Sequence, residues 1–227
     1  MVFAWYTLSQ SLDNHYLLPS PKTVGIEILS LISKIENLIV IGKTLLRLII
    51  TLVIASLFGI ITGFLAAKVI MIDYLIRPVI TILRTTPIAA IIVIILVLVG
   101  RLSSVYIIVL LILFPIIYEG SKRGVLNIDD NIIDAYRLEP SSSIQSFFYV
   151  YFPLALSNIK TALLQSVGLG FKVLVMAEFI VQTNQSIGAK LYEASVSIYY
   201  STIFSWAIIT ILIAISIETL VHKIKTV

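Results

Sequence analysis

Long apolar runs separated by short polar breaks dominate the pattern of this chain. A helix needs about 20 apolar residues to cross the roughly 30 Å hydrocarbon core of a bilayer, because it rises about 1.5 Å per residue. Four or five runs of this kind are present, over residues 44–67, 88–99 with help from 80–83, 105–118, 159–181 and 202–221. The pattern therefore predicts an all-α polytopic membrane protein, with residues 1–227 as a single transmembrane domain.

Two weaker segments precede these runs. Residues 2–18 predict a short or truncated first helix, although polar residues interrupt it. A signal peptide is the alternative, but the segment lacks a basic n-region and an obvious small-residue cleavage site, which favours a retained helix. In residues 18–38, Pro19 and Pro21 precede a helical series of Ile26, Leu29, Ile32, Ile35 and Ile39. This series predicts an amphipathic helix that lies along the outer membrane surface, packs on the bundle, or does both.

Composition agrees with a bilayer protein and narrows its chemistry. The chain is 59% hydrophobic and 12% charged, whereas a soluble domain is roughly one quarter charged. Its formal net charge is +4, and the charged residues are scattered along the chain. The basic runs typical of a nucleic-acid-binding surface are absent from the sequence. There is no cysteine, and His15 and His222 lie far apart in sequence. No disulfide, thiolate nucleophile or cysteine metal site is therefore predicted.

Basic residues predict the orientation, because lysine and arginine are retained on the cytoplasmic side of short loops. If residues 119–158 are cytoplasmic, the richer group falls inside: Lys68, Arg77, Arg84, Lys122, Arg123, Arg137, His222, Lys223 and Lys225. The outside then holds Lys22, Lys34, Arg101 and Lys190. We therefore expect a multi-pass protein of the cytoplasmic (plasma) membrane with a cytoplasmic C-terminus.

A polar, aromatic-rich stretch interrupts the apolar pattern at residues 134–153, DAYRLEPSSSIQSFFYVYFP. Capping side chains at residues 129–131 predict the start of a short helix, which Pro140 ends because the residue before proline leaves helical geometry. Ser142 and Gln145 form a capping box that starts a second helix. The apolar positions of this second helix are Ile144, Phe147, Phe148 and Tyr151. Taken alone, the two short helices are equally compatible with an interfacial filler.

The stretch resembles the EAA loop of ABC importer permeases, in which Glu-Ala-Ala is followed at fixed spacing by glycine and by a closing apolar residue, leucine and proline. Asp134, Ala135 and Tyr136 stand at the opening, Arg137 follows, Pro140 occupies the glycine position, and Val150, Phe152 and Pro153 close the motif. The spacing is kept, but Pro140 is locked near φ −65°, so the turn must be made differently. We also expect Pro153 to break the chain before the next span.

Further segments resemble permeases of the nitrate, sulfonate, taurine and bicarbonate group. They are LPSP at residues 18–21, TLLRLIITLVIASLFGIITG at 44–63, LRTTPIAA at 83–90 and Ala-Glu at 177–178. The matches occur in the order found in that group and cover nearly the whole chain. The resemblance implies a type I ABC importer permease core of five transmembrane helices plus a short N-terminal helix.

The resemblance also implies partners. This chain would hydrolyse nothing and carry no cofactor, while two partner ATPase subunits bind ATP and Mg. A second permease subunit, forming a homodimer, and an extracytoplasmic substrate-binding protein would complete the importer. A coupling loop at about 127–153 would dock on the ATPase through Asp134, Ala135, Tyr136, Arg137, Pro140, Ile144, Phe147, Phe148 and Pro153. Packing of the two phenylalanines under their own bundle is the alternative.

Ionisable residues inside spans are functional candidates, because a charge at mid-membrane costs about 2.5–3.5 kcal/mol on insertion scales. Lys172 lies near the bilayer middle, where it would attract an anionic substrate, snorkel, or pair with a helix carbonyl. Glu178, on another face of the same helix, is expected to act in gating or in contact with the binding protein. Together with Arg84 and Pro87, these two residues are the candidates for the translocation path.

Three further residues have structural interpretations. Arg47 is most simply a headgroup-level anchor, whereas Gly59 and Gly63 form a small-xxx-small pair that predicts close helix packing. A membrane-embedded enzyme is disfavoured, because neither a metal-ligand pair nor a nucleophile-base pair is visible in the sequence. An autonomous secondary transporter or channel is the alternative function, although internal inverted repeats are not apparent. The identity of the solute does not follow from this chain.

Overall fold

The computed structural model describes residues 2–11, 18–129, 131–132, 145 and 147–226, and every regular element in those ranges is a helix. Four helical segments are long and apolar enough to cross a membrane: Ile35–Lys68, Ser103–Leu126, Phe148–Val181 and Tyr200–Lys223. A fifth span results if the bent pair Ile70–Thr85 and Ile88–Val99 counts as one. The predicted all-α polytopic class is therefore confirmed.

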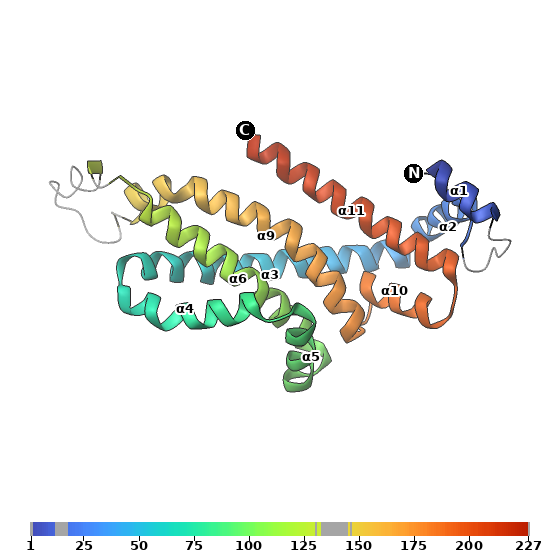
Figure 1. Ribbon diagram of the computed structural model, residues 1–227, viewed down its shortest axis with the longest axis horizontal. Coiled ribbons are helices and arrows are strands. Elements are labelled where there is room, and N and C mark those ends of the chain that lie inside the picture. The colour runs from blue at the N-terminus through green and yellow to red at the C-terminus, as the bar shows by residue number, and fades with distance from the viewer. Residues whose placement is uncertain (1, 12–17, 130, 133–144, 146, 227) are drawn as a thin grey trace.

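Three helices form the centre of the bundle: α3 (Ile35–Lys68), α6 (Arg101–Leu126) and α9 (Phe152–Val181). They run side by side along the long axis of the molecule, and α4 (Ile70–Thr85) lies along α3 (Figure 1). Their shared core is fully buried at Ala55, Ile117 and Leu174. Outward positions of α3, such as Val53 and Phe58, are instead exposed. This apolar exterior suits a lipid environment.

Glycines set the spacing between α3 and α6. A Cβ atom on Gly59 would lie 2.9 Å from the Ile117 side chain, and one on Gly63 would lie 2.5 Å from the Tyr118 carbonyl oxygen. Only residues without a Cβ permit this approach, and the Ser121 hydroxyl then donates to the Ile60 carbonyl at 3.0 Å. The predicted close packing at Gly59 and Gly63 is confirmed.

The apolar run at 80–99 does not form one straight span. It is divided between α4 and α5 (Ile88–Val99), which meet at 109°. Pro87 stands at the N-cap of α5, and the preceding Thr86 is extended at φ −74° and ψ 132°. Since a residue before proline avoids helical geometry, the break falls at this dipeptide, and α5 projects away from the bundle (Figure 1).

The other spans begin earlier than expected. α3 starts at Ile35 rather than at residue 44, because no proline separates the two positions and the single glycine, Gly42, does not stop the helix. The span after the polar loop starts before residue 159, because Pro153 lies in the first turn of α9 and a π-helical turn, η1 (Phe147–Tyr151), runs directly into it. The prediction that Pro153 breaks the chain is wrong. Proline is tolerated in a first turn, where its missing N–H is not needed.

The N-terminal helices are short. α1 (Val2–Ser11) is about 15 Å long and does not reach across a bilayer, as expected of a short first helix. α2 (Pro21–Ser33) is capped at its N-terminus by Ser20, whose hydroxyl accepts from the Thr23 N–H. It packs on α11 (Tyr200–Thr226) through the buried Val24. Packing on the bundle is thus confirmed. The predicted apolar series does not lie on one helix, because the chain breaks at Lys34 between α2 and α3, and all of its members are exposed: Ile26, Leu29, Ile32, Ile35 and Ile39.

The sequence interpretation missed one helix, α10 (Ile187–Val196), which lies between α9 and α11. The signal was present in Ser186, whose hydroxyl caps the helix by accepting from the Ala189 N–H at 3.0 Å. The run is too short and too mixed for a transmembrane segment, so a search for apolar spans passes over it.

Candidate functional site

A polar stripe follows one face of α9. Its polar residues recur at helical spacing, with the small Gly168 between the last two: Ser157, Thr161, Gln165 and Lys172. The stripe is exposed or half-buried, whereas Ile159, Ala162 and Ser166 on other faces are buried in the bundle. Polar groups facing hydrocarbon are costly, and in membrane proteins they face water or another protein chain. The stripe therefore marks a face of the bundle that is not turned to lipid.

One cavity, of about 540 Å³, opens beside the N-terminal part of this stripe. Its polar lining includes Arg84, Glu119, Arg123, Ser157, Thr161 and Gln165. Glu119 on α6 accepts from Arg84 and from Arg123, the latter at 3.2 Å. Arg84 thus lines a polar cavity. Pro87 is not part of this lining; by ending α4 next to Arg84, it fixes where that side chain emerges.

A second cavity, of about 360 Å³, continues along α9 and shares Thr161, Gln165 and Leu169 with the first. Here Lys172 forms an ion pair with Glu218 of α11, with 2.7 Å between Nζ and Oε1. Lys172 and Glu178 have separate partners, as their positions on different helix faces predicted. The sequence interpretation did not single out Glu218, although it is an acidic residue within the last apolar run.

Thiol labelling tests whether the stripe is wet, because the chain contains no cysteine of its own. Cysteine at Gln165 should react with a hydrophilic maleimide at least on the order of tenfold faster than cysteine at Val53, which faces outward from α3. The reason is that reaction requires the thiolate, which an apolar environment disfavours. The labelling rate of each single-cysteine variant in membranes is the measurement. Equal rates would contradict a wet stripe.

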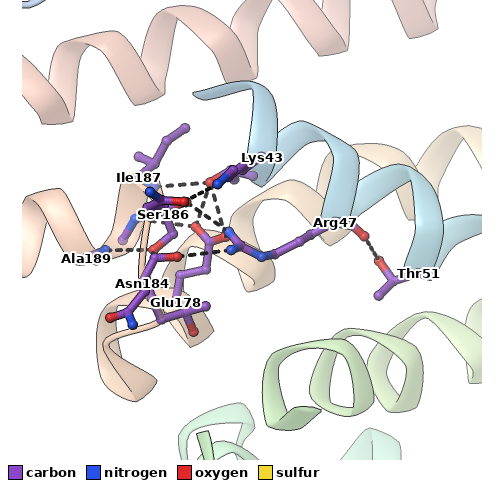
Figure 2. Close-up of polar contacts among 12 residues, drawn as sticks. Lys43, Arg47, Thr51, Glu178, Asn184, Ser186, Ile187 and Ala189 are labelled. Atoms are coloured by element: carbon purple, nitrogen blue, oxygen red, sulfur yellow. Dashed lines mark hydrogen bonds and ion pairs between the residues drawn. The ribbon is translucent and has the colours of Figure 1, made fainter. Parts of the chain in front are cut away.

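A second polar site joins α3, α9 and the α9–α10 turn (Figure 2). Glu178 is 0% exposed and accepts hydrogen bonds from Thr44 Oγ1 at 3.0 and 3.1 Å and from Arg47 Nη1 at 2.9 Å. The Gly188 N–H lies 3.4 Å from its other oxygen. Arg47 also donates to the Asn184 carbonyl at 3.1 Å. The carboxylate is therefore an internal connector, meaning that it joins α9 to α3 and to the start of α10 within one subunit.

These contacts correct two expectations. Glu178 does not face a path or a partner surface, because its side chain is enclosed by its own subunit. Arg47 is not a headgroup anchor, because its side chain is only 13% exposed and its guanidinium binds Glu178. The sequence presented the two as isolated charges more than a hundred residues apart, so their pairing depended on the fold.

Most of the predicted coupling residues lie outside the described residues, namely Asp134, Ala135, Tyr136, Arg137, Pro140 and Ile144. Of Phe147 only the backbone is described, at the start of η1. The Phe148 side chain is 61% exposed. At the other flank, the Asp129 carboxylate accepts from the Asn131 N–H at 2.9 Å, which confirms Asp129 as a capping residue. Both flanks lie at the end of the bundle where α6 ends (Figure 1).

Comparison with known proteins gives a family and a fold. Residues 55–225 match the family model "Binding-protein-dependent transport system inner membrane component". Two solved structures titled "Inward facing conformations of the MetNI methionine ABC transporter" are similar in fold. The CY5 SeMet soak form has a TM-score of 0.62 at 16% identity and covers 79% of this chain and 92% of that chain. The CY5 native form has a TM-score of 0.63 at 14% identity, and the match covers 82% of this chain and 95% of that chain. No curated protein matches the chain.

Proposed function

The chain belongs to the binding-protein-dependent inner membrane components, the permeases of ABC importers, and from this premise we propose that it forms the path of a small solute delivered by an extracytoplasmic binding protein. The observation that carries the proposal is the polar stripe on α9, which borders two adjoining cavities in an otherwise lipid-compatible bundle. ATP hydrolysis would reside on partner ATPase subunits.

The stripe also supports a proposal for where a second permease subunit would pack. Lys172 and Glu218 are both more than half exposed, although they belong to membrane-spanning helices. An ion pair on such helices is favourable only where protein or water covers it. We propose that a second copy of this chain covers the α9 and α11 face, so that the two stripes enclose the path in a homodimer.

The charge of the cavities bears on the solute. Lys172 is neutralised by Glu218, so it gives no argument for an anion. In the first cavity, Arg84 and Arg123 share the single carboxylate of Glu119, which leaves one positive charge in excess among these three residues. This excess, with the resemblance to nitrate, sulfonate, taurine and bicarbonate permeases, supports an anionic solute. Identifying the ligand that co-purifies with the cognate binding protein tests the assignment.

Coupling is proposed to run through the 134–153 loop. Phe148 is a coupling residue with an exposed side chain at the start of the helical segment that carries the stripe. Docking it in an ATPase groove would transmit closure of the ATPase dimer to α9. Phe148→Ala should weaken ATPase association by about 2 kcal/mol, the scale of an interface hot spot, which is roughly 30-fold.

Co-purification of the ATPase and ATP-dependent uptake are the measurements for this variant. Phe58→Ala is the matched control, because Phe58 is a similarly exposed phenylalanine on the lipid-compatible face of α3. The control should retain both activities. Normal ATPase binding and uptake by the Phe148 variant would exclude the docking role.

Reconstitution separates the proposed function from the alternative of an autonomous transporter or channel. The permease in vesicles should move the solute only when the ATPase, ATP and the binding protein are all present. A carrier or channel would move the solute without these partners, because neither class of transport protein uses an ATPase subunit. Uptake by the permease alone would therefore contradict the proposal.

A further inference from the structure

A cluster of charges joins α4 to α6 near the end of the bundle where α3 and α6 end. The buried Asp73 accepts hydrogen bonds from Arg77, from Lys122 and, at 2.9 Å, from the Tyr118 hydroxyl. About one turn before Lys122 on α6, Glu119 forms ion pairs with two further residues, Arg84 and Arg123. We call this group the α4–α6 basic cluster: Asp73, Arg77, Arg84, Glu119, Lys122 and Arg123. Its four cations exceed its two carboxylates, so two positive charges are uncompensated within it.

Two of these cations are available for a further ligand. The side chains of Arg77 and Arg123 are 62% and 71% exposed. In the described part of the chain each donates to its carboxylate through Nη2 alone, and a guanidinium has five N–H donors. Between them opens a cavity of about 370 Å³, whose polar lining also includes Thr81, Tyr118, Lys122 and the two carboxylates of the cluster, Asp73 and Glu119. The cavity thus presents unused guanidinium N–H donors, while the Tyr118 hydroxyl donates to Asp73 and the Thr81 hydroxyl donates to the Arg77 carbonyl.

The neighbouring surface of α4 is apolar. Met71, Leu75 and Ile82 share a face and are all exposed, while Arg77, Thr81 and Arg84 follow the edge between this face and the packed one. Lys122 lies four residues before the end of α6, which is about 6 Å along the helix axis. That depth corresponds to the headgroup layer, since headgroups add roughly 10–15 Å to a 30 Å core over both sides.

We propose that this cavity binds the phosphate headgroup of an anionic phospholipid, whose acyl chains lie over the apolar face of α4. Arg77 and Arg123 would donate to the phosphate oxygens in charge-assisted hydrogen bonds. Asp73 and Glu119, which also line the cavity, hold these two cations in place through their ion pairs. Basic pockets between membrane helices favour such headgroups. The adjoining apolar face favours a lipid over a soluble anion, which has no tails to place there.

Lipid retention tests the site. The purified permease, without ATPase or solute, is exposed to an equimolar mixture of phosphatidylglycerol and phosphatidylcholine, and the retained lipid is counted by native mass spectrometry. The wild type should prefer phosphatidylglycerol. The double variant Arg77→Gln/Arg123→Gln should lose roughly 30-fold of that preference, since each cation near a membrane surface contributes about a factor of five. Arg101→Gln, an exposed arginine at the other end of α6, is the control and should keep it.

The double variant is expected to fold, because Asp73 keeps Lys122 and Tyr118 and Glu119 keeps Arg84; an unchanged melting temperature checks this. Undiminished phosphatidylglycerol preference in the folded variant would overturn the proposal. So would displacement of the lipid by inorganic phosphate, which indicates a free-anion site. A variant that keeps its lipid but loses ATPase association would instead identify a protein surface. Arg123 also lines the first cavity, but lipid retention is measured without solute or ATPase, so its outcome is read separately from solute import.

Discussion

Replacing Glu178 with alanine is expected to destabilise the folded subunit by about 3–5 kcal/mol, the scale of breaking a buried ion pair. The variant leaves the Arg47 guanidinium, which is largely buried, without its counter-charge. It also removes the acceptor of the Thr44 hydroxyl and of the Gly188 N–H. The total free energy of unfolding of a native domain is only about 5–15 kcal/mol. The melting temperature and the yield of monodisperse protein in detergent should therefore fall sharply.

Two variants show whether the cause is the unpaired buried charge. Glu218→Gln breaks the exposed pair with Lys172 and should cost only about 0–1 kcal/mol. The double change Arg47→Met/Glu178→Met removes both charges and should recover most of the lost stability. Replacing a buried ion pair with apolar residues of similar volume often leaves the free energy of unfolding unchanged. If Glu178→Ala melts like Glu218→Gln, the pair does not hold α3 and α9 together.

Replacing Gly63 with valine is expected to separate α3 from α6 and to cost at least about 1–3 kcal/mol, the range for overpacking. The new Cβ would lie 2.5 Å from the Tyr118 carbonyl oxygen and 2.9 Å from the Ser121 Cβ. A backbone oxygen inside a helix cannot move aside, so the helices themselves must shift. The hydrogen bond from Ser121 to the Ile60 carbonyl would also be lost. The melting temperature in detergent measures the effect.

Gly42 provides the matched control on the same helix. No neighbouring atom lies within 4 Å of a Cβ placed there, so Gly42→Ala should gain roughly 0.5–1 kcal/mol from helix propensity alone. Opposite signs at the two glycines would show that the contact between helices, rather than propensity, decides the result. A Gly63→Val protein as stable as the wild type would contradict the close approach of α3 and α6.

The apolar runs predicted the spans well, because the cost of placing a residue in hydrocarbon is largely a property of that residue and its neighbours. Gly59 and Gly63 could likewise be recognised, since a missing Cβ matters wherever two helices meet. The bounds were less accurate: α3 and α9 extend beyond their most apolar parts, and a proline in a first turn was taken for a break. The 109° bend at Pro87 was not foreseen, because the apolar run continues through it.

By itself, the sequence determined that this is a polytopic helical membrane protein, and its motifs indicated an importer permease. Only the tertiary structure decided what the isolated charges do. It paired Arg47 with Glu178, Lys172 with Glu218 and Asp73 with Lys122, which turned one expected path residue into an internal connector and revealed the basic cluster on α4 and α6. The reason is physical: hydropathy is carried by each residue along the chain, whereas the effect of a charge depends on the partner and the solvent that the fold places around it.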